Sequence, residues 1–182
     1  MKLAFLYAGQ GTQQVGMGRD LYEASPAFRN ILDSAPVDFD LKKLCFEGPE
    51  EALSDTRYTQ PAMVAFAAGV TALLYEAGIR PQAAAGLSLG EYSALHAAGV
   101  FTAPQAIALA AFRGAAMAGA VQGRPCGMAA VLGMDRDTLA ACCAAVSDLG
   151  VCEIANYNCP GQIVIAGDSG AVEAACAKAT EQ

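Results

Sequence analysis

Apolar positions in the first two thirds of the chain form two short continuous runs and several longer segments with helical spacing. The short runs, residues 3–8 and 82–87, have the length and near-complete apolarity of strands buried in a parallel sheet. Helices are predicted at residues 17–32 with a break at Ser25 and Pro26, 41–53 with a break at Gly48 and Pro49, 61–77, 88–98 and 102–120. Pro61 is expected in the first turn of its helix, where an N–H has no intrahelical partner to lose. This alternation predicts an α/β fold.

A second group of elements follows the loop at residues 122–125. Strands are predicted at 127–132, 151–156 and 162–166, and helices at 135–146 and 171–179. The order β-α-β-β-α is that of a split βαβ unit without its last strand, and the two strands of the first part are too few for a doubly wound sheet. We therefore expect domains at 1–124 and 125–182, both cut short at the C-terminal end. The chain is interpreted as the N-terminal part of a larger protein, or as a product that stops early.

Composition excludes several classes of protein. The chain is 54% hydrophobic and carries a net charge of −7, which is too apolar for a disordered chain and too acidic for a general nucleic-acid binder. We expect no targeting segment and no membrane span, because the longest apolar run, residues 63–75, is too short, and we expect a cytoplasmic location. There are seven cysteines, an odd number, and no two of them form a C-x-x-C pair. We therefore expect reduced thiols, and we expect no metal site.

The strongest local signal is the G-x-S-x-G motif at residues 86–90, between a predicted strand and a predicted helix. In a nucleophile elbow Gly86 and Gly90 are required because side chains there would collide with the flanking elements. The amide of Leu89, at the helix start, would then donate to the oxyanion of an attacked carbonyl. The alternative is that Ser88 is an ordinary helix N-cap. The strand and helix on either side favour the nucleophile.

A second loop, residues 9–13 with the sequence GQGTQ, follows the first predicted strand. The two glycines around Gln10 let its backbone approach a ligand, so this loop is a candidate for a second oxyanion donor. Gly-x-Gly after a strand is also common in plain turns. The loop is not a phosphate-binding loop, because the lysine of that motif is absent.

Arg113 is the only charged residue between positions 102 and 123, in a helix that is apolar nearly all round. A buried guanidinium requires a carboxylate or phosphate partner, so Arg113 is a candidate for binding a substrate carboxylate. The alternative is an arginine that extends to the surface at the edge of its helix.

No residue of the chain is a credible base for Ser88. The one histidine, His96, follows Ser88 by eight residues on the same predicted helix, which separates them by about 12 Å. We therefore expect His96 to be a structural histidine with a local hydrogen-bond partner.

Six motifs in order give the chain a family resemblance. They are GQGTQ at 9–13, YTQPA at 58–62, GLSLGEYSALHAAG at 86–99, FRG at 112–114, GMAAVLG at 127–133 and NYNCPGQIVIAG at 156–167. Together they resemble the malonyl-CoA:acyl carrier protein transacylase family over essentially the whole chain. The resemblance implies an α/β fold with an α/β-hydrolase-like large domain and an inserted ferredoxin-like subdomain.

The resemblance also implies a ping-pong reaction. Ser88 would attack the thioester of malonyl-CoA, and the phosphopantetheine thiol of acyl carrier protein would then take the malonyl group from the serine. By position in the family motifs, the backbone amides of Gln10 and Leu89 form the oxyanion hole, and Arg113 binds the malonyl carboxylate. No cofactor or metal is implied, and we expect a monomer.

Gln60 and Asn158 lie in family motifs near the active site, and the resemblance implies at most a supporting role for them. The chain departs from the family pattern at Leu87, where the family usually has histidine; that position is not the base, so we expect a small effect. The family's catalytic histidine lies beyond residue 182, so this chain alone is expected to show at most residual transfer.

Two other functions stay open. A serine hydrolase or thioesterase would release the acyl group to water, although Arg113 argues against neutral acyl chains. A non-catalytic fragment that binds coenzyme A or carrier protein is favoured by the missing base. Arg113 and Leu89 favour malonyl-type selectivity. The sequence does not decide between malonyl and methylmalonyl groups, or between fatty-acid and polyketide synthesis. It also does not show whether a basic rim for carrier-protein docking exists, formed by Lys42, Lys43, Arg57 and Arg124.

Overall fold

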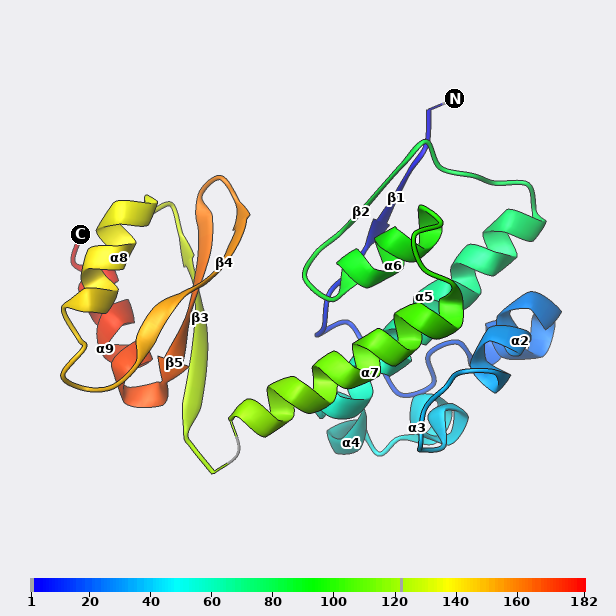
Figure 1. The fold of residues 1–182 in the computed structure, drawn as a ribbon, viewed down its shortest axis with the longest axis horizontal. Coiled ribbons are helices and arrows are strands. Elements are labelled where there is room, and N and C mark those ends of the chain that lie inside the picture. The colour runs from blue at the N-terminus through cyan, green and yellow to red at the C-terminus, as the bar shows by residue number, and fades with distance from the viewer. Residues whose placement is uncertain (1, 122) are drawn as a thin grey trace. The chain divides into compact units, whose positions relative to one another are not determined.

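The computed structural model describes residues 2–121 and 123–182, and the chain divides into two compact units, Met1–Ala120 and Val121–Gln182 (Figure 1). Each unit has its own sheet and its own hydrophobic core. No helix in the described ranges is long and apolar enough to cross a membrane. The coarse prediction of an α/β protein is confirmed.

The first unit holds a two-stranded parallel sheet of β1 (Ala4–Tyr7) and β2 (Ala83–Gly86), each one residue shorter at both ends than predicted. Its helices are α1 (Arg19–Ala24), α2 (Pro26–Asp33), α3 (Leu41–Glu47), α4 (Glu50–Ser54), α5 (Thr56–Glu76), α6 (Gly90–Ala97) and α7 (Ala103–Ala120). The predicted helix breaks at Ser25 and Gly48 are both present.

The sheet of the first unit is covered on one face only. Phe5 and Tyr7 of β1 are half-buried, with Tyr7 hydrogen-bonded to Thr71 of α5, whereas Leu6 between them is 81% exposed. The prediction of fully buried strands is therefore wrong for this face within the residues that the structure describes.

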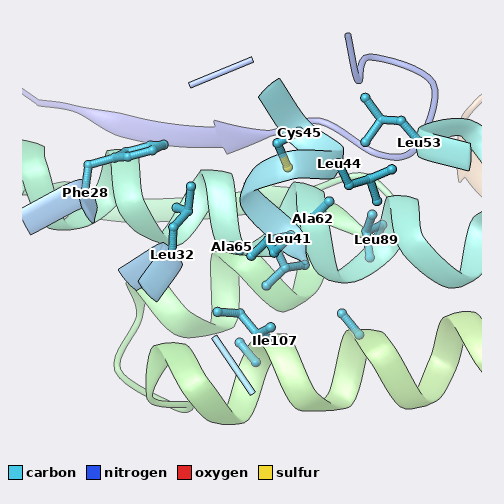
Figure 2. Close-up of a cluster of buried hydrophobic side chains, with 13 residues drawn as sticks. Phe28, Leu32, Leu41, Leu44, Cys45, Leu53, Ala62, Ala65, Leu89 and Ile107 are labelled. Carbon is cyan, nitrogen blue, oxygen red and sulfur yellow. The ribbon is translucent and has the colours of Figure 1, made fainter. Parts of the chain in front are cut away.

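The core of the first unit is formed between its helices, and Figure 2 shows its side chains. Its buried members are Phe28, Leu32, Leu41, Leu44, Cys45, Leu53, Ala62, Val64, Ala65, Leu89, Ala106, Ile107 and Ala110. Leu89 is the member that matters for the candidate site, because it follows Ser88 directly and is only 1% exposed. Its burial fixes the position of the backbone next to the serine.

Helix α5 begins five residues before the predicted start, so Pro61 lies inside the helix and not in its first turn. The Asp55 side chain accepts a hydrogen bond from the Arg57 amide and caps the earlier start. Pro61 removes one helical hydrogen bond, but Thr59, Gln60 and Pro61 are all buried against neighbouring elements. Capping and burial together outweigh the cost of the proline.

The second unit has the predicted order β-α-β-β-α. Its strands are β3 (Cys126–Leu132), β4 (Cys152–Cys159) and β5 (Gln162–Asp168), and its helices are α8 (Arg136–Ala144) and α9 (Ser169–Thr180). The strands are antiparallel in the order β3-β5-β4. Helix residues Leu139 and Ala175 pack with Ile165 of β5 in a core in which all three are fully buried.

Asp168 connects three segments of the second unit. Its carboxylate accepts hydrogen bonds from the Val151 amide and from the Arg124 guanidinium, each at 2.8 Å. The Val151 hydrogen bond is the main cause that holds the pKa of Asp168 below its usual range, and Arg124 lowers it further. Because the folded pKa is lowered, this stabilisation is complete above the unfolded pKa and is lost as the pH falls through the folded value.

We predict that Asp168→Asn lowers the unfolding midpoint of the second unit at pH 7, and that its difference from the parent chain shrinks below about pH 4, where the parent carboxylate also protonates. Tyr157 is the only aromatic residue after position 121, so its ring NMR signals report on this unit. Asp148→Asn, at an exposed position, is the charge-matched control. A difference that is independent of pH would contradict the prediction.

Candidate active site

Ser88 lies in a strained turn between β2 and α6. Its φ is 52°, and in the described ranges it is the only non-glycine residue with a positive φ. Helix α6 starts at Gly90 with Leu89 at the N-cap position, so the alternative interpretation of Ser88 as an N-cap is wrong. The serine is exposed, as expected of a side chain presented on a sharp strand-to-helix turn.

The two glycines of the motif are required by close backbone contacts. A Cβ atom at Gly86 would lie 2.0 Å from the carbonyl of Gly90, and a Cβ at Gly90 would lie 2.3 Å from the carbonyl oxygen of Tyr7. These distances are far below any real carbon–oxygen contact. The steric reason given for both glycines from the sequence is therefore confirmed.

Two candidate oxyanion donors lie in segments that contact each other. The Leu89 amide is at the N-terminus of α6, where backbone amides lack intrahelical partners. The loop of Gln10 passes so close to the elbow that a Cβ at Gly9 would lie 2.9 Å from the carbonyl oxygen of Leu87. The fold thus places the Gln10 loop beside the turn that holds Ser88.

The Arg113 guanidinium points at the serine. One Nη donates to Ser88 Oγ at 3.2 Å, the other donates to Gln60 Oε1 at 2.7 Å, and the guanidinium carbon is 6.0 Å from the centroid of the Tyr92 ring. Within residues 2–121 and 123–182 no carboxylate forms an ion pair with it. Arg113 therefore keeps donors for an anionic ligand next to the serine hydroxyl.

The helix that carries Arg113 is only partly buried. Helix α7 is apolar nearly all round, as its sequence indicates, but it is not buried on every side, because Leu109, Phe112 and Met117 are between 39% and 74% exposed. A helix rich in alanine gives no periodic signal of which face is covered. Arg113 itself is half-buried and lies on the side of α7 that faces α5.

Gln60 continues the network away from the serine. Its side chain is fully buried, and its Nε2 donates to Thr56 Oγ1 at 2.8 Å and approaches Met117 Sδ at 3.3 Å. Thr56 Oγ1 in turn donates to Gln10 Oε1 at 2.9 Å. The structure therefore brings together five of the predicted site residues, Ser88, Leu89, Arg113, Gln60 and Gln10, in the first unit.

Thr56 and Tyr92 were missed from the sequence. Thr56 precedes Gln60 by four residues, and Tyr92 follows Ser88 by four, so helical spacing could have indicated both. Asn158 is the sixth predicted residue and belongs to the second unit, where its Nδ2 donates to Gln162 Oε1 at 3.0 Å.

His96 is not available to Ser88. Its Nδ1 lies 3.0 Å from the carbonyl oxygen of Phe101, in the loop that follows its own helix. This confirms the expectation of a structural histidine with a local partner.

Other nucleophiles and ligands are less favoured by the geometry. Burial raises the pKa of the Cys45 thiol to about 12, and burial is also the main cause that raises the pKa of Cys143 to about 12, so neither thiol ionises readily near neutral pH. In the part of the chain that the structure describes, no three metal-ligating side chains come together. A cavity of about 810 Å³ between β1 and α5 is lined by Leu89 and Ser93 but not by Ser88.

The sequence of the chain is similar to that of known acyl transferases. Residues 4–182 match the model of the acyl transferase domain. Over 183 positions the chain is 43% identical to a malonyl CoA-acyl carrier protein transacylase of Bacillus subtilis, covering 99% of the chain and 58% of that protein. The chain therefore spans a little over half the length of this relative.

Solved structures agree over the full chain. An acyl-carrier-protein S-malonyltransferase from Bartonella henselae superposes with a TM-score of 0.89 at 38% identity, covering 100% of this chain and 60% of that one. A malonyl-transacylase solved in complex with a type II polyketide-synthase acyl-carrier protein gives a TM-score of 0.87, with the same identity and coverage.

The position of Arg113 depends on the next residue, Gly114. A Cβ there would lie 2.6 Å from the carbonyl oxygen of Thr56 and 3.2 Å from the Cα of Arg57, both backbone atoms of α5. We predict that Gly114→Ala forces α7 away from α5 and destabilises the first unit by about 1–3 kcal/mol.

Gly119→Ala in the same helix is the matched control. Gly119 has no atom within 4 Å of an added Cβ, so alanine there is expected to be neutral or to stabilise the helix by up to about 1 kcal/mol. Urea denaturation followed by circular dichroism measures both variants. Equal effects at the two positions would show that helix propensity, and not the contact with α5, sets the requirement for glycine.

Proposed function

The chain belongs to the acyl transferase domain family, and from this premise we propose that it transfers malonyl groups from malonyl-CoA to the phosphopantetheine thiol of an acyl carrier protein. The transfer would serve fatty-acid or polyketide synthesis. The relatives with this named activity are longer than the chain, which covers 58% of the Bacillus subtilis protein. The proposal therefore concerns the activity to which these residues contribute.

The observation that carries the proposal is the 3.2 Å contact between Arg113 and Ser88 Oγ. A fixed cation beside a nucleophile favours an acyl group that carries its own negative charge close to the reacting carbonyl. A malonyl group has a carboxylate on the carbon next to its thioester carbonyl. Neutral acyl chains would leave the guanidinium without that partner, which is the physical argument against a simple esterase.

In the proposed reaction Ser88 Oγ attacks the thioester carbonyl of malonyl-CoA, and the amides of Gln10 and Leu89 stabilise the oxyanion. The carbon–sulfur bond breaks, coenzyme A leaves as the thiol after taking up the proton, and a malonyl-serine ester forms. The carrier-protein thiol then attacks this ester and restores the serine. No cofactor or metal takes part, and we propose that the protein acts as a monomer.

A base must accept the proton from Ser88. His96 is not available for this, because its Nδ1 is hydrogen-bonded to the carbonyl oxygen of Phe101. The family resemblance implies a histidine at a position beyond 182. This leaves a second candidate function, a chain that binds coenzyme A or carrier protein without turnover.

We propose domain limits of 1–124 and 125–182. The first would be an α/β-hydrolase-like acyltransferase core, and the second a ferredoxin-like subdomain whose sixth element, a strand, would pair with β3. Support comes from the parallel β1–β2 pair that leads into the elbow and from the β3-β5-β4 order of the second sheet. For Asn158, on β4, we propose no more than the supporting role that its family motif implies.

We predict that the chain incubated with malonyl-CoA gains one malonyl group, measured by intact mass, and that Ser88→Ala gains none. Arg113→Ala is expected to slow this acylation about 10–100-fold, as for the loss of a charge-assisted hydrogen bond. It should slow acylation by acetyl-CoA far less.

Arg80→Ala is the control for general charge, because Arg80 stacks on Tyr75 elsewhere in the first unit. An adduct that persists in Ser88→Ala would contradict the assignment of the nucleophile. A folded chain that binds coenzyme A and forms no adduct would favour the non-catalytic alternative, and rapid release of malonate to water would favour a hydrolase.

A further inference from the structure

A continuous series of side-chain hydrogen bonds connects the serine to the Gln10 loop. Arg113 donates to Ser88 at 3.2 Å and to Gln60 at 2.7 Å. Gln60 donates to Thr56 at 2.8 Å, and Thr56 donates to Gln10 at 2.9 Å. The series joins the residue proposed to bind carboxylate with the loop proposed to stabilise the oxyanion, and Gln60 and Thr56 lie between them.

The direction of each hydrogen bond follows from the chemistry of the groups. A guanidinium only donates, so Gln60 must turn its oxygen toward Arg113 and its NH₂ toward Thr56. The Thr56 hydroxyl then accepts from Gln60, which leaves its single proton for the oxygen of Gln10. One donor-only group therefore fixes the orientation of two amides and a hydroxyl.

Burial makes the Thr56 hydroxyl hard to replace. The Gln60 side chain is fully buried, so water does not readily substitute for a lost partner. The other nearby acceptor, Met117 Sδ at 3.3 Å, is a weak one. Without the hydroxyl, the Gln60 amide has no strong acceptor and its orientation toward Arg113 is less well defined.

The far end of the series holds an exposed loop. Gln10 is exposed, and the same loop makes a second contact of this kind, from Gln13 Nε2 to Ser54 Oγ at 3.5 Å. The Gln10–Thr56 bond, to the start of α5, is shorter than the Gln13–Ser54 contact, to the end of α4, so it is the stronger of the two.

We propose that Thr56 is a positioning residue that couples Arg113 to the Gln10 loop through its hydroxyl. The coupling is inferred from geometry alone. Its effect on catalysis rests on the proposed function. In the described ranges the Thr56 side chain has hydrogen bonds to Gln60 and Gln10 and none to Ser88. It acts by holding Gln60 in the orientation that Arg113 requires and by holding Gln10 at its side-chain oxygen.

The kinetic test compares Thr56→Val, which keeps the shape and removes the hydroxyl, with Thr56→Ser, which keeps the hydroxyl. Thr56→Val is expected to lower the maximal rate of Ser88 malonylation about tenfold, equivalent to about 1.4 kcal/mol, with less change in the malonyl-CoA concentration that gives half that rate. Thr56→Ser should restore the rate. Equal loss in both variants, or a parent-like rate in Thr56→Val, would overturn the proposal.

Gln10→Leu removes the acceptor of the Thr56–Gln10 hydrogen bond. Because the Gln10 side chain is exposed, this variant is expected to fold, and it tests the coupling even where Thr56→Val does not fold. It should lower the rate in the same direction, and the double variant should be no slower than Thr56→Val alone, because Thr56→Val already removes the hydrogen bond that Gln10→Leu removes. A parent-like rate in Gln10→Leu, or additive losses in the double variant, would overturn the coupling.

A substrate-free measurement separates failure of this inference from failure of the proposed function. In NMR spectra of the full chain, Thr56→Val should speed solvent exchange of the Gln60 side-chain amide about tenfold and shift the backbone amides of residues 9–13, whereas Thr56→Ser should not. Where even the parent chain forms no malonyl adduct, the proposed function fails and these spectra alone decide. Unchanged Gln60 exchange in Thr56→Val would then overturn the coupling.

Discussion

The candidate site depends on one backbone contact, between α7 at Gly114 and the first turn of α5 at Thr56. No side chain fits between the two helices at this point. The contact brings Arg113, the residue before the glycine, within 2.7 Å of Gln60 and 3.2 Å of Ser88. A cation in a largely apolar helix thereby lies beside a hydroxyl that is contributed by a different element.

The elbow itself is held by a different set of forces. A positive φ at Ser88 is unfavourable for a residue with a side chain, and it persists because the flanking residues allow no alternative. Leu89 is buried in the core on one side, and Gly86 and Gly90 pack against neighbouring backbone on the other. The cost of the strained turn is therefore offset by burial of an apolar side chain that has no part in the chemistry.

Local patterns predicted the elbow, the Arg113 candidate and the order of elements, since each depends on residues close together in sequence. What depends on distant partners was not predicted. The start of α5 was misplaced because Pro61 is a stronger signal than the Asp55 cap. The apolar run at residues 3–8 predicted a buried strand, whereas Leu6 of β1 is exposed. The role proposed for Thr56 also depends on its contact with Gln10, which lies 46 residues away in the sequence and which no sequence period reveals.

The composition of α7 does not define its own register. Alanine, glycine and leucine occupy most of its positions, so its apolar residues show no periodic signal of which face is buried. Each residue turns an α-helix by about 100°, so a glycine one position earlier or later in α7 would point the guanidinium in a direction that differs by that angle. Gly114 therefore sets the rotation of α7 about its own axis, because only the side that carries the glycine can contact α5 so closely. That rotation in turn sets the direction of the Arg113 side chain.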